Sequence, residues 1–204
     1  MQLIGMLDSP YVRRSAISLR MLGVLFEHRA VSVFRHFDEF RGINPVVKAP
    51  TLVCDDGTVL MDSNLIVAHA EDVAPAGRTL MPAAAAERVA AYRVLGLALA
   101  ACEKSISIVY ERQLRPVEKQ HAPWIERVTG QLLAACSTLE QELTSPRALS
   151  VLTPSLQPGI TAVVTWRFLQ MMVPEIVIAA EYPGWAALSA EAEKLPAFVE
   201  FPPE

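Results

Sequence analysis

Apolar and polar residues alternate with two different rhythms along the chain. In the first eighty residues, short continuous apolar runs alternate with segments whose apolar residues have helical spacing, and the pattern changes about every ten residues. From residue 83 onward, apolar residues recur at helical spacing over long stretches, which predicts helices without strands. We therefore expect an α/β domain followed by an all-helical domain.

The apolar runs and turn-forming residues of the first part predict the element order β-α-β-α-β-β-α. Ser9 precedes Pro10, which suits the first position of a helix because its missing N–H has no partner there, and Gly23 ends that helix. Two apolar runs around residues 55–58 are typical of a β-hairpin, so the four-stranded sheet is expected to be mixed. The expected segments are a strand at 2–6, a helix at 10–22, a strand at 27–34, a polar helical segment at 36–42, strands at 51–54 and 59–61, and a helix from 63.

A stretch rich in proline, glycine and small residues, 75–82, separates the two parts, as is typical of a linker. We predict an N-terminal domain at 1–76, a linker at 77–82 and a helical domain at 83–204. The apolar spacing in the helical domain predicts helices at about 83–118, 124–143, 158–172 and 185–194.

Composition and charge disfavour several classes of protein. Hydrophobic residues make up 52% and charged residues 20% of the chain, so there is enough apolar material for packed cores and intrinsic disorder is disfavoured. The formal net charge is −4 and the sequence pI is about 5.6. Because no basic patch is present to bind a phosphate backbone, we expect no nucleic-acid partner.

Membrane, secretory, disulfide and metal-binding features are also not expected. The longest stretch without a charge, 148–166, is interrupted by prolines and hydroxyl residues, whereas a membrane span needs about 20 mostly apolar residues. The first residues lack the positive charge of a signal peptide. Cys54, Cys102 and Cys136 form no CxxC pair and the histidines show no metal-ligand spacing, so we expect no metal site and a reducing cytoplasm.

Ser9 lies at the junction of the first expected strand and the first expected helix. The free N–H groups and the dipole of a helix N-terminus stabilise negative charge, so a thiolate placed beside Ser9 is stabilised there. The alternative is that Ser9 only caps its helix, which is common for serine before proline. Because residues 9–12 contain no cysteine, disulfide exchange by the protein's own thiol is disfavoured at this position.

Lys48, Ala49 and Pro50 directly precede the third expected strand. If the Ala49–Pro50 peptide bond is cis, the N–H and C=O of Ala49 turn outward and can pair with the backbone of a peptide ligand. Only about 5–6% of X–Pro bonds in folded proteins are cis, so the residue pattern leaves both isomers open.

Asp62 and Ser63 stand at the start of the next expected helix. The helix N–H groups and the Ser63 hydroxyl suit a carboxylate, and Asp62 suits an ammonium group, so the pair matches the head of an α-amino acid. Helix capping alone is the alternative for this pair. Together with Ser9 and residues 48–50, the pair suggests a site for a small zwitterionic peptide that carries a thiol.

Three segments carry a resemblance to a known family: residues 9–13 read SPYVR, residues 44–52 read NPVVKAPTL, and residues 62–66 read DSNLI. These motifs, in this order, are similar to those of the cytosolic glutathione transferase superfamily, and the likeness spans nearly the whole chain. The chain most resembles bacterial members with Ser at the catalytic position. The resemblance implies an α/β plus all-α fold, with a thioredoxin-like N-terminal domain (βαβαββα, mixed four-stranded sheet) and a helical-bundle C-terminal domain.

The resemblance also implies a role for each matching residue in binding glutathione as co-substrate. Ser9 is expected to hydrogen-bond the glutathione sulfur and lower its pKa. Ala49, before a cis Pro50, is expected to pair with the cysteinyl backbone, and Lys48 to approach the glycyl carboxylate. Asp62 and Ser63 are expected to hold the γ-glutamyl head.

Members of this superfamily usually form homodimers and bind the electrophile between their two domains. By position, Tyr11, Glu103, Ser107 and Tyr110 are candidates for that second-substrate pocket. For the three residues near the middle of the chain, ordinary helix surface or core is the favoured alternative.

The sequence departs from the family pattern at three places. Ala49 stands where most relatives have Val, and Asp62 stands where Glu is more usual. A helix-capping Ser/Thr-x-x-Asp motif of the C-terminal domain is also not intact, because Ser155 is followed by residues 156–159 without an Asp. A proline can still open that helix, so we expect the fold to persist with a weaker cap.

The favoured function is a glutathione S-transferase that activates the thiol for attack on a small hydrophobic electrophile, as in detoxification. The alternatives are a glutathione-binding or regulatory module without catalysis, and a glutathione-dependent isomerase, peroxidase or lyase. Two further interpretations concern single residues. Arg13 and Arg14 are interpreted as surface or interdomain charges, and Trp166 as a core residue rather than part of the pocket.

Overall fold

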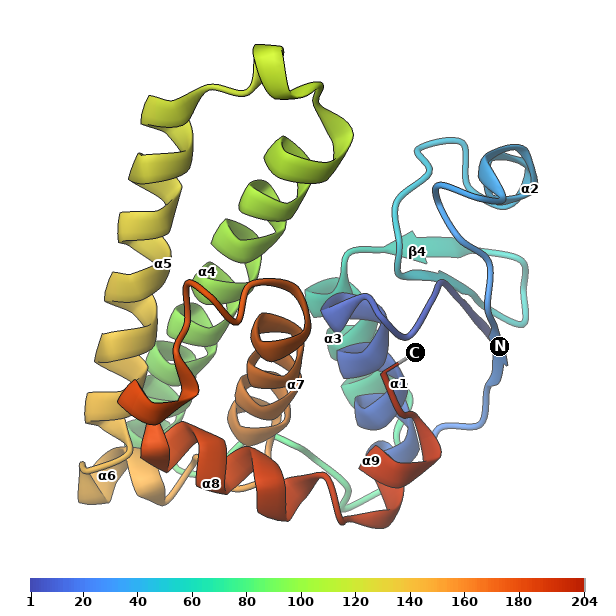
Figure 1. Cartoon of the computed structure of the whole chain (residues 1–204). Coiled ribbons are helices and arrows are strands. Elements are labelled where there is room, and N and C mark those ends of the chain that lie inside the picture. The colour runs from blue at the N-terminus through green and yellow to red at the C-terminus, as the bar shows by residue number, and fades with distance from the viewer. Residues whose placement is uncertain (204) are drawn as a thin grey trace. The chain divides into compact units, whose positions relative to one another are not determined.

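The computed structural model describes residues 1–203, which form two compact units. Unit 1 comprises Met1–Leu80 together with the chain from Lys194 onward, and unit 2 comprises Met81–Glu193. Figure 1 shows the elements of each unit.

Unit 1 is built on a mixed sheet with the strand order β2-β1-β3-β4. The edge strand β2 runs parallel to β1, whereas β1–β3 and β3–β4 are antiparallel. Leu3 in β1 lies opposite His28 in β2 and Leu52 in β3, and both leucines are fully buried. The strands are β1 (Gln2–Ile4), β2 (Glu27–Arg29), β3 (Thr51–Val53) and β4 (Val59–Met61).

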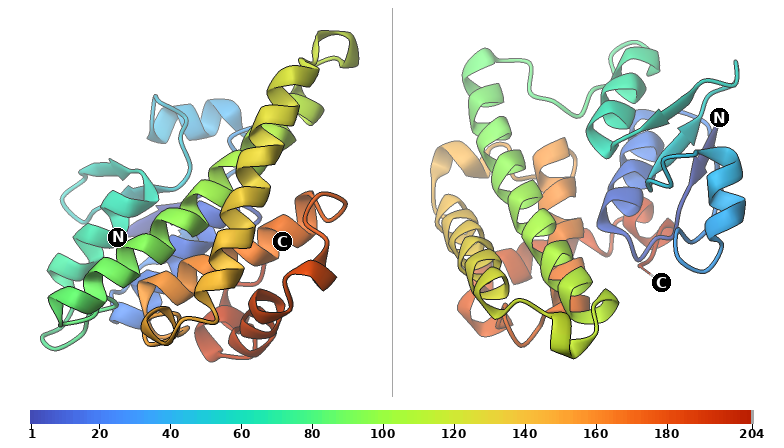
Figure 2. Two further views of the ribbon diagram at one scale, coloured as in Figure 1. Left: turned by 90° about the vertical axis from the view of Figure 1, so that its left-hand side faces the viewer. Right: turned by 90° about the horizontal axis from the view of Figure 1, so that it is seen from above.

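The helices of unit 1 follow the predicted order, so its thioredoxin-like topology is confirmed. Helices α1 and α3 pack together and cover one face of the sheet, while α2 lies on the other side (Figures 1 and 2). Helix α1 ends where the sequence predicts, because Gly23 takes a left-handed conformation (φ 75°) and its N–H donates to the carbonyl of Arg20. The helices are α1 (Pro10–Leu22), α2 (Phe37–Ile43), α3 (Ser63–Val73) and α9 (Pro196–Glu200).

The second strand is shorter than predicted. It ends at Arg29 instead of continuing to Phe34, and a turn follows. The buried hydroxyl of Ser32 accepts hydrogen bonds from the N–H groups of Phe34 (3.2 Å) and Arg35 (3.1 Å). Because these amides bond to a side chain, they cannot pair with a neighbouring strand. The segment therefore turns here, although its apolar and β-branched residues favour a strand.

Unit 2 is entirely helical within the described residues. All four predicted helices are present, and α4 packs against both α5 and α7 (Figure 2). Short 3₁₀ turns at Val117–Lys119 and Ala179–Glu181 and the four-residue helix α6 were not predicted. The bounds are α4 (Ala85–Leu114), α5 (Ala122–Glu142), α6 (Pro146–Leu149), α7 (Gln157–Met172) and α8 (Pro183–Ala192).

Trp166 belongs to the core of unit 2, as interpreted from the sequence. Its ring lies 6.3 Å from that of Tyr182 and 5.3 Å from that of Trp185, measured between centroids, and it is only 5% exposed. The indole N–H of Trp185 donates to the carbonyl of Ala162 at 2.9 Å. The three aromatic rings therefore join α7 and α8 and the turn between them.

Helix α7 begins without a side-chain cap, as the interrupted motif predicts. Its N-cap is Leu156, which makes no side-chain cap hydrogen bond. The start of the helix instead lies very close to the preceding turn, since a Cβ at Gly159 would stand 1.9 Å from the carbonyl oxygen of Thr153. The backbone approach at Gly159 leaves no space for a side chain.

The C-terminal end of the helical domain differs from the prediction of 83–204. Residues 194–203, including α9, belong to unit 1. Sequence spacing alone does not reveal such a return, because the contacts join residues about 180 positions apart, such as Arg13 and Phe201. Over residues 1–203, no helix is long and apolar enough to cross a membrane.

Candidate functional site

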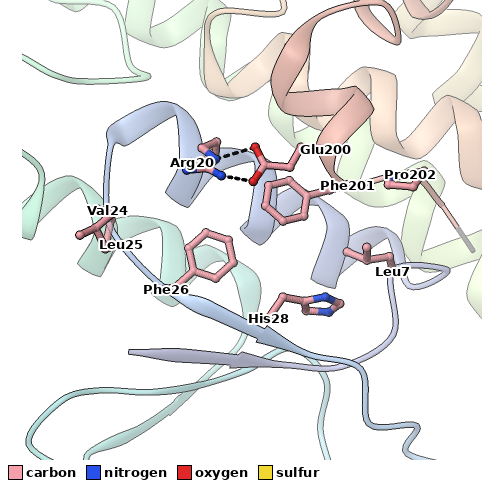
Figure 3. Close-up of a pocket in the computed structure, with 9 residues that line it drawn as sticks. All are labelled: Leu7, Arg20, Val24, Leu25, Phe26, His28, Glu200, Phe201 and Pro202. Carbon is pink, nitrogen blue, oxygen red and sulfur yellow. Dashed lines mark hydrogen bonds and ion pairs between the residues drawn. The ribbon is translucent and has the colours of Figure 1, made fainter.

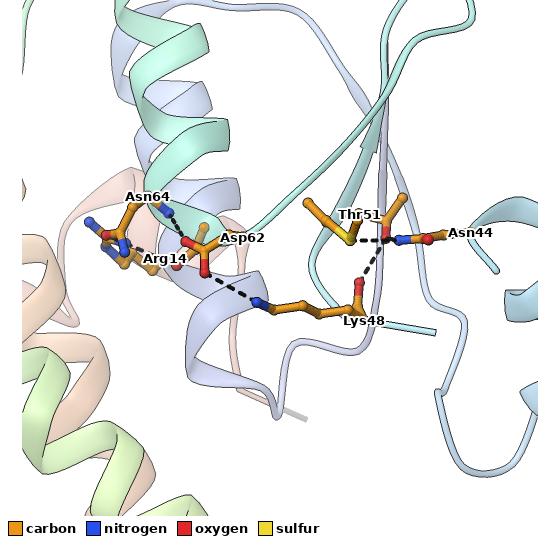
Figure 4. A network of polar contacts seen from close by, with 8 residues as sticks. Arg14, Asn44, Lys48, Thr51, Asp62 and Asn64 are labelled. Carbon is orange, nitrogen blue, oxygen red and sulfur yellow. Dashed lines mark hydrogen bonds and ion pairs between the residues drawn. The ribbon is translucent and has the colours of Figure 1, made fainter. Parts of the chain in front are cut away.

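The candidate binding residues come from three segments of unit 1: the start of α1, the loop before β3 and the start of α3. Figure 4 shows Lys48 of the loop reaching toward Asp62, with Nζ 3.2 Å from Oδ2. Ser63 follows Asp62 directly and opens α3. Hence the structure brings Lys48 together with Asp62 and Ser63, and the polar groups of this cluster can hold both an acid and an amine.

Ser9 occupies the N-cap position of α1 but does not cap the helix through its side chain. Its backbone is extended (φ −71°, ψ 120°), and its carbonyl accepts the first helical hydrogen bond from the Arg13 N–H at 3.0 Å. The side chain makes no cap hydrogen bond, and the residue is half-buried. The hydroxyl is therefore not committed to α1 and lies beside the positive end of the helix dipole.

The Ala49–Pro50 peptide bond is cis, the isomer that the ligand hypothesis required. Pro50 is buried and Ala49 half-buried, whereas the Lys48 side chain is exposed. Among residues 1–203, neither the N–H nor the C=O of Ala49 takes part in a loop or turn hydrogen bond. Both groups are consequently free to pair with a peptide backbone.

A buried pair that the sequence analysis did not single out holds the loop before β3. The Asn44 side-chain amide donates to the Thr51 hydroxyl at 2.9 Å, and that hydroxyl donates to the carbonyl of Lys48 at 2.7 Å (Figure 4). Asn44 is 2% exposed and Thr51 fully buried. The signal for this pair was the Asn-Pro turn at residues 44–45, since asparagine side chains stabilise turns by bonding to nearby backbone. Its Oδ1 does so here with the N–H of Val46, at 3.0 Å.

Asp62 is both the N-cap of α3 and the partner of Lys48. It takes a left-handed backbone conformation (φ 73°), and its Oδ1 accepts the N–H of Asn64 at 2.9 Å. Burial raises the pKa of the Asp62 carboxyl, but the hydrogen bonds from Asn64 and Lys48 and the charges of Lys48 and Arg14 outweigh it, so the pKa is lowered. Asp62 is therefore an anion at neutral pH.

Arg14 is the main residue of the site that sequence reasoning misplaced. It was interpreted as a surface or interdomain charge, yet it is 3% exposed. Its Nη1 donates to Ser63 Oγ at 3.0 Å and to Asn64 Oδ1 at 2.8 Å. Because the Ser63 oxygen accepts from Arg14, the Ser63 hydrogen remains available to donate to a ligand, and a positive charge lies beneath the start of α3.

The four second-substrate candidates divide between the two units. Tyr11 is a half-buried residue of α1 in unit 1, while the other three share one face of α4 in unit 2. Glu103 is exposed and pairs with Lys104 at 2.9 Å, and the Ser107 hydroxyl donates to the Glu103 carbonyl at 2.9 Å. Tyr110 is 47% exposed. The contacts within unit 2 are those of an ordinary helix surface.

The surroundings of Cys54 and Cys136 disfavour their thiolate forms. Burial, with the negative charges of Asp56 and Asp55, raises the pKa of Cys54, and burial raises the pKa of Cys136 to about 12. Cys54 was expected within the third strand, but β3 ends at Val53, so Cys54 is the first residue after the strand. Within the described part of the chain, no group of three or more His, Cys, Asp or Glu residues is arranged to hold a metal ion.

Removing the Lys48 amine tests the electrostatics of Asp62. We expect Lys48→Met to raise the Asp62 pKa toward its ordinary value, because one hydrogen bond and one positive charge are lost. A lowered pKa stabilises the fold above the ordinary pKa, and this contribution disappears as the pH falls through the lowered value. The variant therefore loses this contribution at a higher pH than the wild type. NMR titration of the Asp62 carboxyl measures the shift.

Arg41→Met is the matched control, since Arg41 pairs with Asp38 on the surface of α2 in the same unit. It is expected to leave the Asp62 titration unchanged. An unaltered Asp62 pKa in Lys48→Met would show that the Asn64 N–H and Arg14 suffice to hold the carboxylate.

Comparison with known proteins gives the site a family context. Residues 3–78 match the family model of the glutathione S-transferase N-terminal domain. A solved glutathione transferase family member from Pseudomonas fluorescens Pf-5, determined with bound glutathione, is 25% identical and superposes with a TM-score of 0.86 over 100% of this chain and 98% of its own. Residues 3–78 therefore resemble a glutathione S-transferase N-terminal domain, and the chain as a whole has the fold of this solved glutathione transferase family member.

Two further proteins show the same likeness. A glutathione S-transferase from Methylobacterium radiotolerans, solved with glutathione sulfonate, is 25% identical with a TM-score of 0.85, covering 98% of this chain and 92% of its own. The uncharacterised GST-like protein YibF of Escherichia coli (strain K12) is 28% identical over 142 residues, 69% of this chain and 68% of its own.

Proposed function

We propose that this protein is a glutathione S-transferase that activates the glutathione thiol for attack on a small hydrophobic electrophile. The observation that carries the proposal is the Ser9 hydroxyl, which stands at the start of α1 without serving as its cap. Polar groups suited to the two ends of a peptide lie in the same unit. The glutathione bound in the relative from Pseudomonas fluorescens supports the same ligand here.

The residues fit glutathione group by group. The Ser63 hydroxyl and the N–H groups that open α3 suit the γ-glutamyl carboxylate, and Asp62 suits its ammonium. The free N–H and C=O of Ala49 suit the cysteinyl backbone. Lys48 suits the glycyl carboxylate, for which it must exchange its present contact with Asp62. The ammonium group of the ligand then takes the place of the Lys48 amine beside the Asp62 carboxylate.

Ser9 acts on the thiol through its hydroxyl hydrogen, which donates to the sulfur and stabilises the thiolate. A free thiol with a pKa near 8.5 is only a few per cent ionised at neutral pH, so lowering that pKa increases the reactive fraction. The N-terminal dipole of α1 acts in the same direction. The thiolate then attacks an electrophilic carbon: the sulfur–carbon bond forms as the bond from that carbon to its leaving group breaks, and the leaving group, a halide in an alkyl or aryl halide, departs with the electron pair. Tyr11 in unit 1 and Glu103, Ser107 and Tyr110 in unit 2 remain the candidates for contact with the electrophile.

Cellular context and assembly are part of the same proposal. We propose a cytoplasmic, homodimeric enzyme of detoxification. The three free cysteines support a reducing compartment. The resemblance to the superfamily supports the dimer.

Calorimetric titration with reduced glutathione tests the binding half of the proposal. We expect saturable binding by the wild type and its loss in the double variant Asp62→Ala/Ser63→Ala, because both charges of the γ-glutamyl head lose their partners. A matched double variant in the same unit, Asp38→Ala/Ser32→Ala, is expected to bind as the wild type does.

An electrophile panel then tests the catalytic half. Turnover of alkyl or aryl halides supports the transferase. Tight glutathione binding with no turnover of any electrophile, isomerisable substrate or peroxide would instead identify a binding or regulatory module. The absence of binding at millimolar glutathione would overturn the proposed function altogether.

A further inference from the structure

The last residues of the chain return to unit 1 and pack along α1. Residues 194–203, here called the C-terminal segment, contain α9 and two buried aromatic side chains, Phe198 and Phe201. They are 1% and 7% exposed, and α9 contacts α1. The segment is thus part of the fold of the N-terminal unit.

Arg13 of α1 is the central contact of this segment. It was interpreted from the sequence as a surface or interdomain charge, but it is 1% exposed. Its Nε donates to the Phe201 carbonyl at 2.7 Å and its Nη2 to the Phe198 carbonyl at 3.4 Å. The guanidinium also lies over the Phe198 ring, 5.8 Å from the centroid.

A second contact lies two turns further along the same face of α1. Arg13 and Arg20 are seven residues apart, so their side chains leave the helix in nearly the same direction. Arg20 pairs with Glu200 through both Nε and Nη2, and the Phe26 and Phe201 rings stack at 5.7 Å (Figure 3).

The two contacts differ in packing. A cavity of about 400 Å³ is lined by Arg20, Glu200, Phe26 and Phe201, and the Arg20 side chain is half-exposed (Figure 3). Arg13, by contrast, is enclosed by protein. An exposed ion pair contributes little, whereas a buried guanidinium requires its hydrogen-bond acceptors in place. The Arg13 contact therefore restricts the position of α1 more tightly than the Arg20 contact.

Arg13 is also bonded directly to the residue that carries the proposed thiol chemistry. Its own N–H donates to the carbonyl of Ser9 at 3.0 Å, one helical turn away. A continuous path consequently runs from the Phe201 carbonyl through the Arg13 side chain and backbone to Ser9. The next residue, Arg14, holds Ser63 and Asn64 at the other end of the site.

We propose that Arg13 is a positioning residue for Ser9, and that the C-terminal segment acts on the thiol end of the site through it. This inference rests on the proposed function. From the first turn of α1 the guanidinium reaches both carbonyls and lies over the Phe198 ring, so these contacts restrain the position of that turn. The Ser9 hydroxyl must meet the glutathione sulfur within hydrogen-bond distance, and a displacement of about 1 Å can lower a rate about 100-fold.

Arg13→Met and Arg20→Met form a matched pair that tests this role. Both substitutions remove a guanidinium that contacts the C-terminal segment from the same face of α1, but only Arg13 lies in the first turn of the helix, directly after Ser9. The pKa of glutathione bound to each variant is measured from thiolate ultraviolet absorbance against pH. The dissociation constant is measured by calorimetry at a pH where the thiol is protonated, and thermal unfolding verifies the fold.

We expect Arg13→Met to raise the pKa of the bound thiol by about one unit, which is about tenfold less thiolate below the pKa. Its glutathione affinity is expected to change less than about threefold, because Lys48, Asp62 and Ser63 remain. Arg20→Met is expected to leave both quantities unchanged. Arg13→Lys keeps the charge but loses the planar guanidinium, so we expect its bound thiol to have a pKa between those of the wild type and Arg13→Met.

Three outcomes would overturn the inference. An unaltered thiol pKa in Arg13→Met makes the residue purely structural, and an equal shift in Arg20→Met makes the effect a general loosening of α1. A wild type that binds glutathione without lowering its thiol pKa overturns the proposed function as well, whereas the first two outcomes leave it standing. If Arg13→Met does not fold, Arg13→Lys and Phe198→Leu replace it, and a wild-type thiol pKa in both overturns the inference.

Discussion

Replacing Ser9 with alanine is expected to lower kcat/KM for conjugation about 100-fold or more, while glutathione binding persists. Removing one hydrogen-bond donor from a developing or stabilised anion typically lowers a rate by about 10²–10³-fold. The Ser9 side chain is not needed as a helix cap, so its loss removes the donor without removing a bond that α1 uses. Initial rates with an aryl halide electrophile measure the effect.

The pH profile separates this mechanism from loss of structure. Ser9→Ala raises the pKa of the bound thiol, so its rate curve moves to higher pH and approaches that of the wild type where both thiols are ionised. Ser15→Ala is the matched control on the same helix, because the Ser15 hydroxyl donates only to the Tyr11 carbonyl of its own helix, at 2.9 Å. Wild-type turnover by Ser9→Ala at neutral pH would remove Ser9 from the mechanism.

Gly159→Ala is expected to destabilise unit 2 by about 3 kcal/mol or more, since overpacking a filled space usually costs about 1–3 kcal/mol and sometimes exceeds that. The new Cβ would stand 1.9 Å from the Thr153 carbonyl oxygen and 2.9 Å from the Pro154 nitrogen, and both are backbone atoms. A flexible side chain can move away, but here the turn before α7 must move. Urea or thermal unfolding monitored by circular dichroism measures the loss.

Gly130→Ala supplies the control for this prediction. Gly130 lies in α5, where an added Cβ meets nothing within 4 Å. Alanine there is expected to stabilise the helix by about 0.5–1 kcal/mol, because it lowers the conformational entropy of the unfolded chain. Equal stability of Gly159→Ala and wild type would show that the turn at Thr153 adjusts freely and does not restrain the start of α7.

Local signals in the sequence predicted those parts of the fold whose causes lie within a few residues. Ser9, Pro10 and Gly23 marked both ends of α1, and both ends are where the structure has them. The turn at residues 55–58 set the β3–β4 hairpin, where Gly57 has φ 86°. Asp62 was expected at the start of α3 and is its N-cap.

The same kind of reasoning failed where a polar side chain took a hydrogen-bond partner that the composition of its segment does not reveal. The segment 27–34 has strand composition, but the Ser32 hydroxyl binds two amides and turns the chain. Arg13 and Arg14 are charged residues of the kind found on helix surfaces, yet both are buried. The acceptor of Arg13 at Phe198 lies 185 residues away, and the acceptor of Arg14 at Ser63 lies 49 residues away.

The sequence determined the element order and indicated the likeness to glutathione transferases and the candidate residues for a glutathione-like ligand, because short motifs specify caps, turns and donor groups locally. The tertiary structure decided which of those groups are already engaged. It showed that the Ser9 hydroxyl is not the helix cap, that Lys48 pairs with Asp62, and that Arg14 holds Ser63. It also assigned the C-terminal segment to the N-terminal unit. Burying a guanidinium requires acceptors in a fixed place, and only the folded chain brings such distant acceptors together.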